Sequence, residues 1–153
     1  MIKIMFVCHG NICRSPMAEF IFKKMINDRG LEGDYFVLSS ATSTEEIGNT
    51  IYPPAKAELT RRGVAFSYEK RAVQLRRDDY DKYDLFVGMD SKNIRNMHLI
   101  FGSDPDGKIR KLMDYTGRGG DVSDPWYSDR FDVAFDDINE GCGCLLDLLE
   151  HTR

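Results

Sequence analysis

The sequence predicts an α/β fold: a single doubly wound domain in which helices cover both faces of a four-stranded parallel sheet. Two observations lead to this prediction. Short apolar segments typical of buried strands alternate with segments whose apolar residues recur every three or four positions, the spacing of an amphipathic helix. Parallel strands need long crossovers, which these helices supply. The length of 153 residues is typical of one domain, so residues 1–153 are assigned to one domain.

The expected strands are runs of apolar residues. In the first of them, residues 2–7, Lys3 is the only polar residue, which indicates a buried strand. The other expected strands are residues 35–39, 85–89 and 108–113.

The expected helices begin at characteristic residues. Ser15 and Pro16 open the first helix, with Ser15 as the cap and Pro16 at the first helical position, and this helix continues to about residue 27. The other expected helices are residues 53–63, 91–100 and 130–150, and residues 114–128 are expected to form a long surface loop. The last helix carries an apolar stripe that faces the core: Phe131, Phe135, Ile138, Cys142, Leu145 and Leu149.

The composition excludes several classes of protein. Hydrophobic residues make up 42% and charged residues 30% of the chain, so a core can be buried and a disordered chain is excluded. The net charge of −4 disfavours binding to a nucleic acid backbone. No apolar run approaches the ~20 residues of a membrane helix, and residues 1–7 are too short for a signal peptide, so a cytoplasmic location is expected. Four cysteines are too few for a disulfide scaffold and are expected as thiols.

The loop after the first strand, residues 8–14, is the first candidate site, because ligands of such sheets bind outside the carboxyl ends of the strands. Its backbone N–H groups and the following helix N-terminus form a cradle for an anion. Gly10 and Asn11 tolerate the left-handed backbone that a cradle requires, and Arg14 can bind two phosphate oxygens at once. Cys8 lies in a field that favours the nucleophilic thiolate. Together these features indicate phosphoryl transfer through a phosphocysteine.

Other interpretations of the loop are weaker. The Gly-Lys-Ser/Thr ending of a nucleotide-binding loop and the glycine pattern of a dinucleotide fingerprint are both missing. Cys8 as a buried structural thiol and Arg14 as a surface residue remain the alternative, which the position and composition of the loop disfavour. Ser15 has two compatible roles: capping the helix, or stabilising the Cys8 thiolate as a leaving group.

Residues 8–19, Cys-His-Gly-Asn-Ile-Cys-Arg-Ser-Pro-Met-Ala-Glu, closely resemble the signature of the low molecular weight protein tyrosine phosphatases. Three further segments resemble that family: residues 39–42 (Ser-Ser-Ala-Thr), 89–93 (Met-Asp-Ser-Lys-Asn) and 124–127 (Asp-Pro-Trp-Tyr). The resemblance spans most of the chain. It implies an enzyme without a cofactor that hydrolyses phosphotyrosine in tyrosine-phosphorylated protein substrates.

The resemblance also implies roles for individual residues. Cys8 would be the nucleophile, Arg14 the phosphate clamp, and Asp124 the acid that protonates the departing phenolate and then the base that activates water. Composition alone would make Asp124 a turn residue, since Asp-Pro is common in turns. The remaining members of the phosphate-binding loop would be His9, Gly10, Asn11, Ile12, Cys13 and Ser15.

The expected pocket wall consists of Trp126, Tyr127 and Glu45. The two aromatic residues would stack on the substrate ring, with ordinary partial burial as the alternative. Glu45 stands where several family members carry an aromatic residue, and residues 67–71 replace a histidine common in the family. Both departures concern substrate preference rather than the chemistry.

The resemblance further implies that Ser39 supports the loop through hydrogen bonds with Asn11. It also implies a reversible disulfide between Cys13 and Cys8, with an inert second thiol as the alternative. His9 is expected at the pocket rim.

Four other residues of chemical interest receive ordinary structural roles. Cys142 and Cys144 are expected to be structural, and His98 and His151 to lie on helix surfaces. No metal site is expected, because no ligand-like spacing is present. The protein is expected to be a monomer or a weak homodimer.

Three alternative functions remain beside a tyrosine phosphatase. Arsenate reductases of the same fold need further cysteines, and none stands between Cys13 and Cys142. Phosphoarginine phosphatases resemble this sequence but carry threonine in place of Ile12, and an apolar residue suits an aromatic leaving group better. A non-catalytic phosphotyrosine-binding module would need neither the nucleophile Cys8 nor the acid Asp124.

Overall fold

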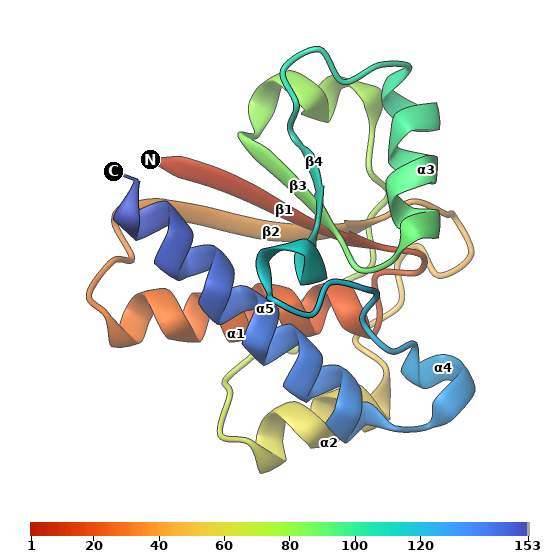
Figure 1. Ribbon diagram of the computed structural model, residues 1–153. Helices are drawn as coiled ribbons and strands as arrows, with labels where there is room; N and C mark the ends of the chain where they lie inside the picture. Colours follow the sequence, from red (N-terminus) through yellow and green to blue (C-terminus); the bar gives the residue numbers. More distant parts are fainter. Residues whose placement is uncertain (153) are drawn as a thin grey trace.

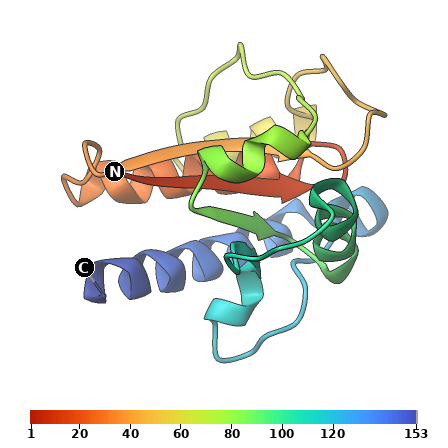
Figure 2. The ribbon, with the colours of Figure 1, turned by 90° about the horizontal axis from the view of Figure 1, so that it is seen from above.

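The computed structural model describes residues 1–152 and has the expected four-stranded parallel sheet, whose strand order is β2-β1-β3-β4. Helices lie against both faces of the sheet (Figures 1 and 2). The strands are β1 (Ile2–Cys8), β2 (Tyr35–Ala41), β3 (Leu85–Gly88) and β4 (Ile109–Lys111). The helices are α1 (Arg14–Asp28), α2 (Pro53–Arg61), α3 (Ser91–Phe101), α4 (Pro125–Ser128) and α5 (Phe131–His151), with 3₁₀ helices η1 (Arg77–Lys82) and η2 (Leu112–Tyr115).

The alternating side chains of the central strand β1 divide the core into two parts. Ile4 and Phe6 are fully buried among side chains of α1 and α5. Met5 and Val7 point to the other face and pack with side chains of η1 and α3. Both faces of β1 are therefore covered, and the strand runs through the centre of the molecule to Cys8 at its carboxyl end.

The carboxyl ends of parallel strands meet at one edge of a sheet. The segments that follow β1, β2 and β3 therefore converge there, beside the start of α3 and the loop that carries α4 (Figure 1). None of the helices in residues 1–152 combines the length and apolar character needed to cross a bilayer.

Two expected segments differ from the structure, each for a local reason. The strand expected at residues 108–113 ends at Lys111, because its partner β3 ends at Gly88 and offers no further backbone pairing. The chain turns into η2, which buries Leu112 and Met113 without a strand. The expected surface loop 114–128 contains the end of η2 and all of α4.

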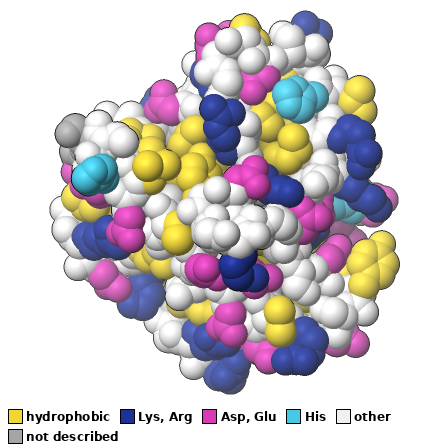
Figure 3. All heavy atoms as spheres, viewed as in Figure 1, with side chains coloured by type: hydrophobic (Ala, Val, Ile, Leu, Met, Phe, Trp, Pro, Cys, Tyr) yellow, Lys and Arg dark blue, Asp and Glu magenta, His cyan; other side chains and the backbone are white. Residues whose placement is uncertain are grey.

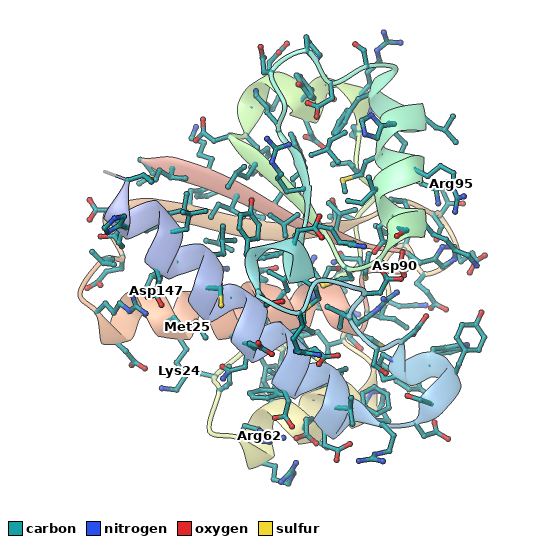
Figure 4. The ribbon with its side chains drawn as sticks, in the orientation of Figure 1. Lys24, Met25, Arg62, Asp90, Arg95 and Asp147 are labelled. Carbon is teal, nitrogen blue, oxygen red and sulfur yellow. The ribbon has the colours of Figure 1, made fainter. Side chains whose placement is uncertain are left out.

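The expected apolar stripe of α5 is confirmed and packs on α1, where Met25 reaches the helix (Figure 4). Two glycines of α5 have contrasting surroundings. A Cβ atom on Gly141 would lie 2.5 Å from Leu112 Cγ, whereas one on Gly143 would meet only Met25 Cε at 4.0 Å. The side chain of Leu112 thus packs directly against the helix backbone at Gly141.

Gly141→Ala should lower the free energy of unfolding by about 1–2 kcal/mol, because the overlap with Leu112 outweighs the better helix propensity of alanine. Gly143→Ala, on the same helix, should raise it by about 0.5–1 kcal/mol through propensity alone. Urea unfolding of both variants measures the difference. Equal effects of the two substitutions would contradict the packing described for Gly141.

Candidate active site

The loop from Cys8 to Ser15 leaves β1 and curls around one sulfur atom. The backbone N–H groups of Asn11 and Ser15 point at Cys8 Sγ, at 3.3 and 3.4 Å. Asn11 has a φ of 59°, in the left-handed region where asparagine is tolerated better than most residues. The sulfur is therefore surrounded by donors that would stabilise a thiolate or an anion bound beside it.

Ser15 does not cap the helix, so that expectation is wrong. α1 begins at Arg14, its N-cap residue is Cys13, and no side chain caps it, which places Pro16 in the first turn but not at its first position. The Ser15 hydroxyl is engaged elsewhere: it accepts from Asn11 Nδ2 at 2.7 Å and lies 3.0 Å from Cys8 Sγ. This position is compatible with the expected contact to the leaving thiolate.

The Arg14 guanidinium is buried, with a relative exposure of 3%. Its Nη2 lies 2.9 Å from Asp90 Oδ2 and 3.5 Å from Asp124 Oδ2, and its Nη1 donates to the Val122 carbonyl at 3.2 Å. Burial alone would lower the pKa of Arg14, but the negative charges of Cys8, Asp124 and Asp90 outweigh it and raise the pKa above the ordinary value. Arg14 is therefore a permanent cation, fixed in place.

Asp124 lies in the loop before α4 and faces this cation. Its Oδ1 accepts from the backbone N–H of Trp126 at 3.1 Å and so caps α4, with Pro125 in the first turn. The carboxyl group thus has the turn role that composition suggests, and it also contacts the phosphate-binding loop through Arg14. One pocket of about 470 Å³ brings together Cys8, Arg14 and Asp124.

The outer part of this pocket holds the residues expected at its wall and rim. Trp126 is half-exposed and packs on Tyr52, with 5.1 Å between the ring centroids, while Tyr127 is 85% exposed. Glu45 lies 3.0 Å from His9 Nε2, so an ion pair stands at the rim when the histidine is protonated. The pocket therefore has an aromatic side and a charged side.

Support for the loop comes from β2, as the sequence predicts. Asn11 Nδ2 donates to Ser39 Oγ at 3.0 Å. Cys13 is buried at the pocket, and burial, together with the nearby Cys8 and Asp124, raises the pKa of its thiol to about 12. Cys13 is thus a neutral thiol at physiological pH. Across residues 1–152, no three His, Cys, Asp or Glu side chains cluster as a metal site would require.

Comparison with known proteins identifies the family. The family described as "Low molecular weight phosphotyrosine protein phosphatase" matches residues 3–153. The chain is 36% identical over 148 residues to the low molecular weight protein-tyrosine-phosphatase YfkJ of Bacillus subtilis, covering 95% of this chain and 94% of that protein. The chain belongs to the low molecular weight phosphotyrosine protein phosphatase family.

Solved structures of similar proteins agree with this assignment. The structure of this phosphatase is similar to the crystal structure of YfkJ from Bacillus subtilis, with a TM-score of 0.95 and 35% sequence identity. The similarity covers 100% of this chain and 97% of that one. The structure of DARP, titled a Drosophila arginine phosphatase, matches with a TM-score of 0.88 and 27% identity, over 97% and 98% of the two chains. The low molecular weight phosphatase fold of this chain is therefore shared by proteins named for different substrates.

One side chain of this phosphatase site was missed from the sequence. Asp90 stands two residues after β3 and caps the start of α3 (Figure 4), where its carboxylate accepts from Asn93 N at 2.8 Å and holds Arg14. An aspartate directly after the expected strand 85–89, at the carboxyl edge of the sheet, was the available signal. The contact of Arg14 with the Val122 carbonyl could not be predicted from the sequence, because every residue has a backbone carbonyl group.

Asp90→Asn should lower kcat/KM by about tenfold, because Arg14 loses a charged hydrogen-bond partner. It should also lower the melting temperature, because the buried guanidinium loses a compensating charge, although asparagine still caps the helix. Steady-state kinetics and thermal unfolding measure the two effects. Asp147→Asn, which breaks a surface ion pair with Arg29 on the far side of the molecule (Figure 4), is the matched control. Unchanged kcat/KM in Asp90→Asn would show that Arg14 does not depend on this carboxylate.

Proposed function

We propose that this protein hydrolyses phosphotyrosine in tyrosine-phosphorylated proteins through a phosphocysteine intermediate. One observation carries the proposal: Cys8 among inward-facing N–H groups, the buried cation Arg14 and the carboxyl group of Asp124 share one pocket. Binding alone would need neither a nucleophile nor an acid. A single phosphatase domain over residues 1–153 is part of the proposal.

In the first step, the Cys8 thiolate attacks phosphorus and the bond from phosphorus to the tyrosine oxygen breaks. Asp124 donates its proton to that oxygen, so tyrosine leaves as a neutral phenol. Arg14 and the loop N–H groups hold the other phosphate oxygens and stabilise the charge that develops on them. Because these groups are fixed before substrate arrives, little reorganisation is needed.

In the second step, the Asp124 carboxylate accepts a proton from water, whose oxygen attacks phosphorus. The bond between phosphorus and sulfur breaks, inorganic phosphate forms, and Cys8 leaves as a thiolate. The Ser15 hydroxyl, 3.0 Å from the sulfur, can donate to that thiolate and ease its departure. The enzyme returns to its starting state.

The pocket favours an aromatic leaving group. Trp126, supported by Tyr52, offers a ring face, and Ile12 is an apolar residue of the lining. Phosphoarginine is the second candidate substrate, because Glu45 and Glu46 at the rim could hold a guanidinium group and DARP is titled an arginine phosphatase. A comparison of kcat/KM for phosphotyrosine and phosphoarginine decides between them, and we expect phosphotyrosine to be preferred.

We further propose that the enzyme acts in the cytoplasm, as a monomer or weak homodimer. The mechanism needs Cys8 as a free thiolate, which a reducing compartment preserves, and all four cysteines are free thiols in the structure. Acidic and basic side chains are interspersed on the face shown in Figure 3, which suits contacts with protein substrates better than with a nucleic acid backbone.

Cys13 is proposed as the partner of Cys8 on oxidation. Peroxide would convert the Cys8 thiolate to a sulfenic acid, and the neutral Cys13 thiol would condense with it to a disulfide and water. The two cysteines belong to one tight loop and both line the pocket. The disulfide would protect Cys8 from further, irreversible oxidation.

The role of Asp124 is tested with Asp124→Asn and a series of aryl phosphates whose leaving groups differ in pKa. Phosphotyrosine, whose phenol has a pKa of about 10, needs a proton donor, whereas an activated aryl phosphate hardly does. We expect kcat/KM to fall at least about 100-fold for phosphotyrosine and little for the activated ester. Cys8→Ser should have no turnover and supplies the baseline. Parallel leaving-group slopes in the wild type and Asp124→Asn would mean that the acid lies elsewhere, for example at Asp121 or Asp129.

The role of Cys13 is tested by mild peroxide treatment followed by thiol. Wild-type activity should return, whereas Cys13→Ala should be active before treatment but recover poorly, because its Cys8 proceeds to irreversible oxides. Cys144→Ala, on α5, is the control and should recover like the wild type. Equal recovery in Cys13→Ala and the wild type would remove Cys13 from this role.

A further inference from the structure

A lysine from the segment after α2 reaches under the phosphate-binding loop. Lys70 Nζ donates to Asn11 Oδ1 at 2.8 Å, to the Ser39 carbonyl at 3.2 Å and to the Arg71 carbonyl at 2.9 Å. Each of the three ammonium hydrogens therefore has an acceptor. This half-buried side chain takes no part in the mechanism proposed above.

Lys70 fixes which way the Asn11 amide faces. The amide oxygen of Asn11 accepts from Lys70 Nζ and also from the backbone N–H of Val73, at 3.1 Å. Both of these groups can only donate, so the oxygen must face them and the NH₂ group must face the opposite side. There it donates to Ser15 Oγ at 2.7 Å and to Ser39 Oγ at 3.0 Å.

The branch through Ser39 has a direction for the same reason. Having accepted from Asn11, the Ser39 hydroxyl donates its single proton to Glu19 Oε1 at 2.6 Å. Glu19 is buried, and its other oxygen accepts from Lys23 Nζ, also at 2.6 Å. The chain thus runs from Lys70, which only donates, to the Glu19 carboxyl group, whose two oxygens both accept.

The branch through Ser15 ends at the nucleophile. Because Ser15 Oγ accepts from Asn11, its one proton is free to point at Cys8 Sγ, 3.0 Å away, or at the Ser40 carbonyl, 3.4 Å away. The closer sulfur is the stronger acceptor once it is a thiolate. An Asn11 amide facing the other way would instead accept from Ser15 and withdraw that proton from the sulfur.

We propose that Lys70 is a positioning residue of this active site: by holding the Asn11 amide oxygen, it keeps the Ser15 hydroxyl as a donor to Cys8. The inference rests on the proposed role of Cys8 as nucleophile.

The charge of Lys70 acts in the same direction as its hydrogen bonds. Burial lowers the pKa of Lys70, the negative charges of Glu19 and Cys8 oppose that shift, and Lys23 adds to it. Electrostatic interaction is mutual, so a thiolate that favours the ammonium is itself favoured by it. Removing Lys70 should therefore destabilise the Cys8 thiolate in two ways: through the loss of the positive charge and through the loss of the Ser15 hydrogen bond.

The test compares Lys70→Met, which keeps the length but neither donor nor charge, with Lys70→Arg, which keeps both. Iodoacetate alkylates only the thiolate, so its inactivation rate against pH reports the thiolate fraction of Cys8. In Lys70→Met the midpoint of that curve should move up by about one pH unit, and kcat should fall about tenfold while KM changes by less than about threefold. Lys70→Arg should recover most of both.

Lys24→Met is the matched control, because Lys24 lies on the outer surface of α1 (Figure 4) and pairs there with Asp28. It should behave like the wild type. If Lys70→Met does not fold, Lys70→Gln replaces it; its amide carries no charge and can present an acceptor, so the midpoint should move in the same direction.

An unchanged midpoint in folded Lys70→Met or Lys70→Gln, with or without loss of activity, overturns the proposal, because a merely structural role would not move the thiolate fraction. The wild type in the same assays tests the proposed function separately. A wild type without turnover and without inactivation by iodoacetate would refute that function. An active wild type beside an unchanged Lys70→Met would refute the role of Lys70 alone.

Discussion

The burial of the Arg14 guanidinium is the constraint on which the site depends. A buried cation is tolerable only if it is paired and hydrogen-bonded. Its partners come from separate parts of the chain: Asp90 follows β3, and Val122 and Asp124 belong to the loop before α4. A single side chain at the start of α1 therefore ties the connection after β3 and the loop before α4 to the phosphate-binding loop, at the carboxyl edge of the sheet.

A second set of polar contacts holds the phosphate-binding loop from below. Lys70 and Glu19 form its ends, and the amide of Asn11 and the hydroxyl of Ser39 connect them. The loop is thus fixed by Arg14 on the pocket side and by this chain on the core side. Hydrogen-bond donors that already point at the anion position stabilise the transition state more than mobile donors do, because they need not reorganise during the reaction.

The sequence predicted the parts of the molecule that depend on local pattern. The parallel sheet, the stripe on α5 and the loop after β1 follow from apolar spacing and from adjacent residues. The end of β4 was predicted two residues too late because the length of this strand depends on where β3 ends. Ser15 was misassigned because its hydroxyl bonds to Asn11 rather than to the helix end. Asp90 and Lys70 gave weak signals, since their partners in the loop are distant in the sequence.

Cys8 and Asp124 belong to parts of the molecule that differ in local stability against unfolding. Cys8 is the last residue of the central strand β1. The two residues before it, Phe6 and Val7, are fully buried and pair with β2 on one side and β3 on the other. Asp124 belongs to an outer connection beside the exposed Trp126 and Tyr127. Segments with few buried contacts open locally well before a core strand does. If the outer loop that carries Asp124 opened locally, the loop at Cys8 would therefore still bind an anion. Asp124 could then no longer donate a proton to the leaving group.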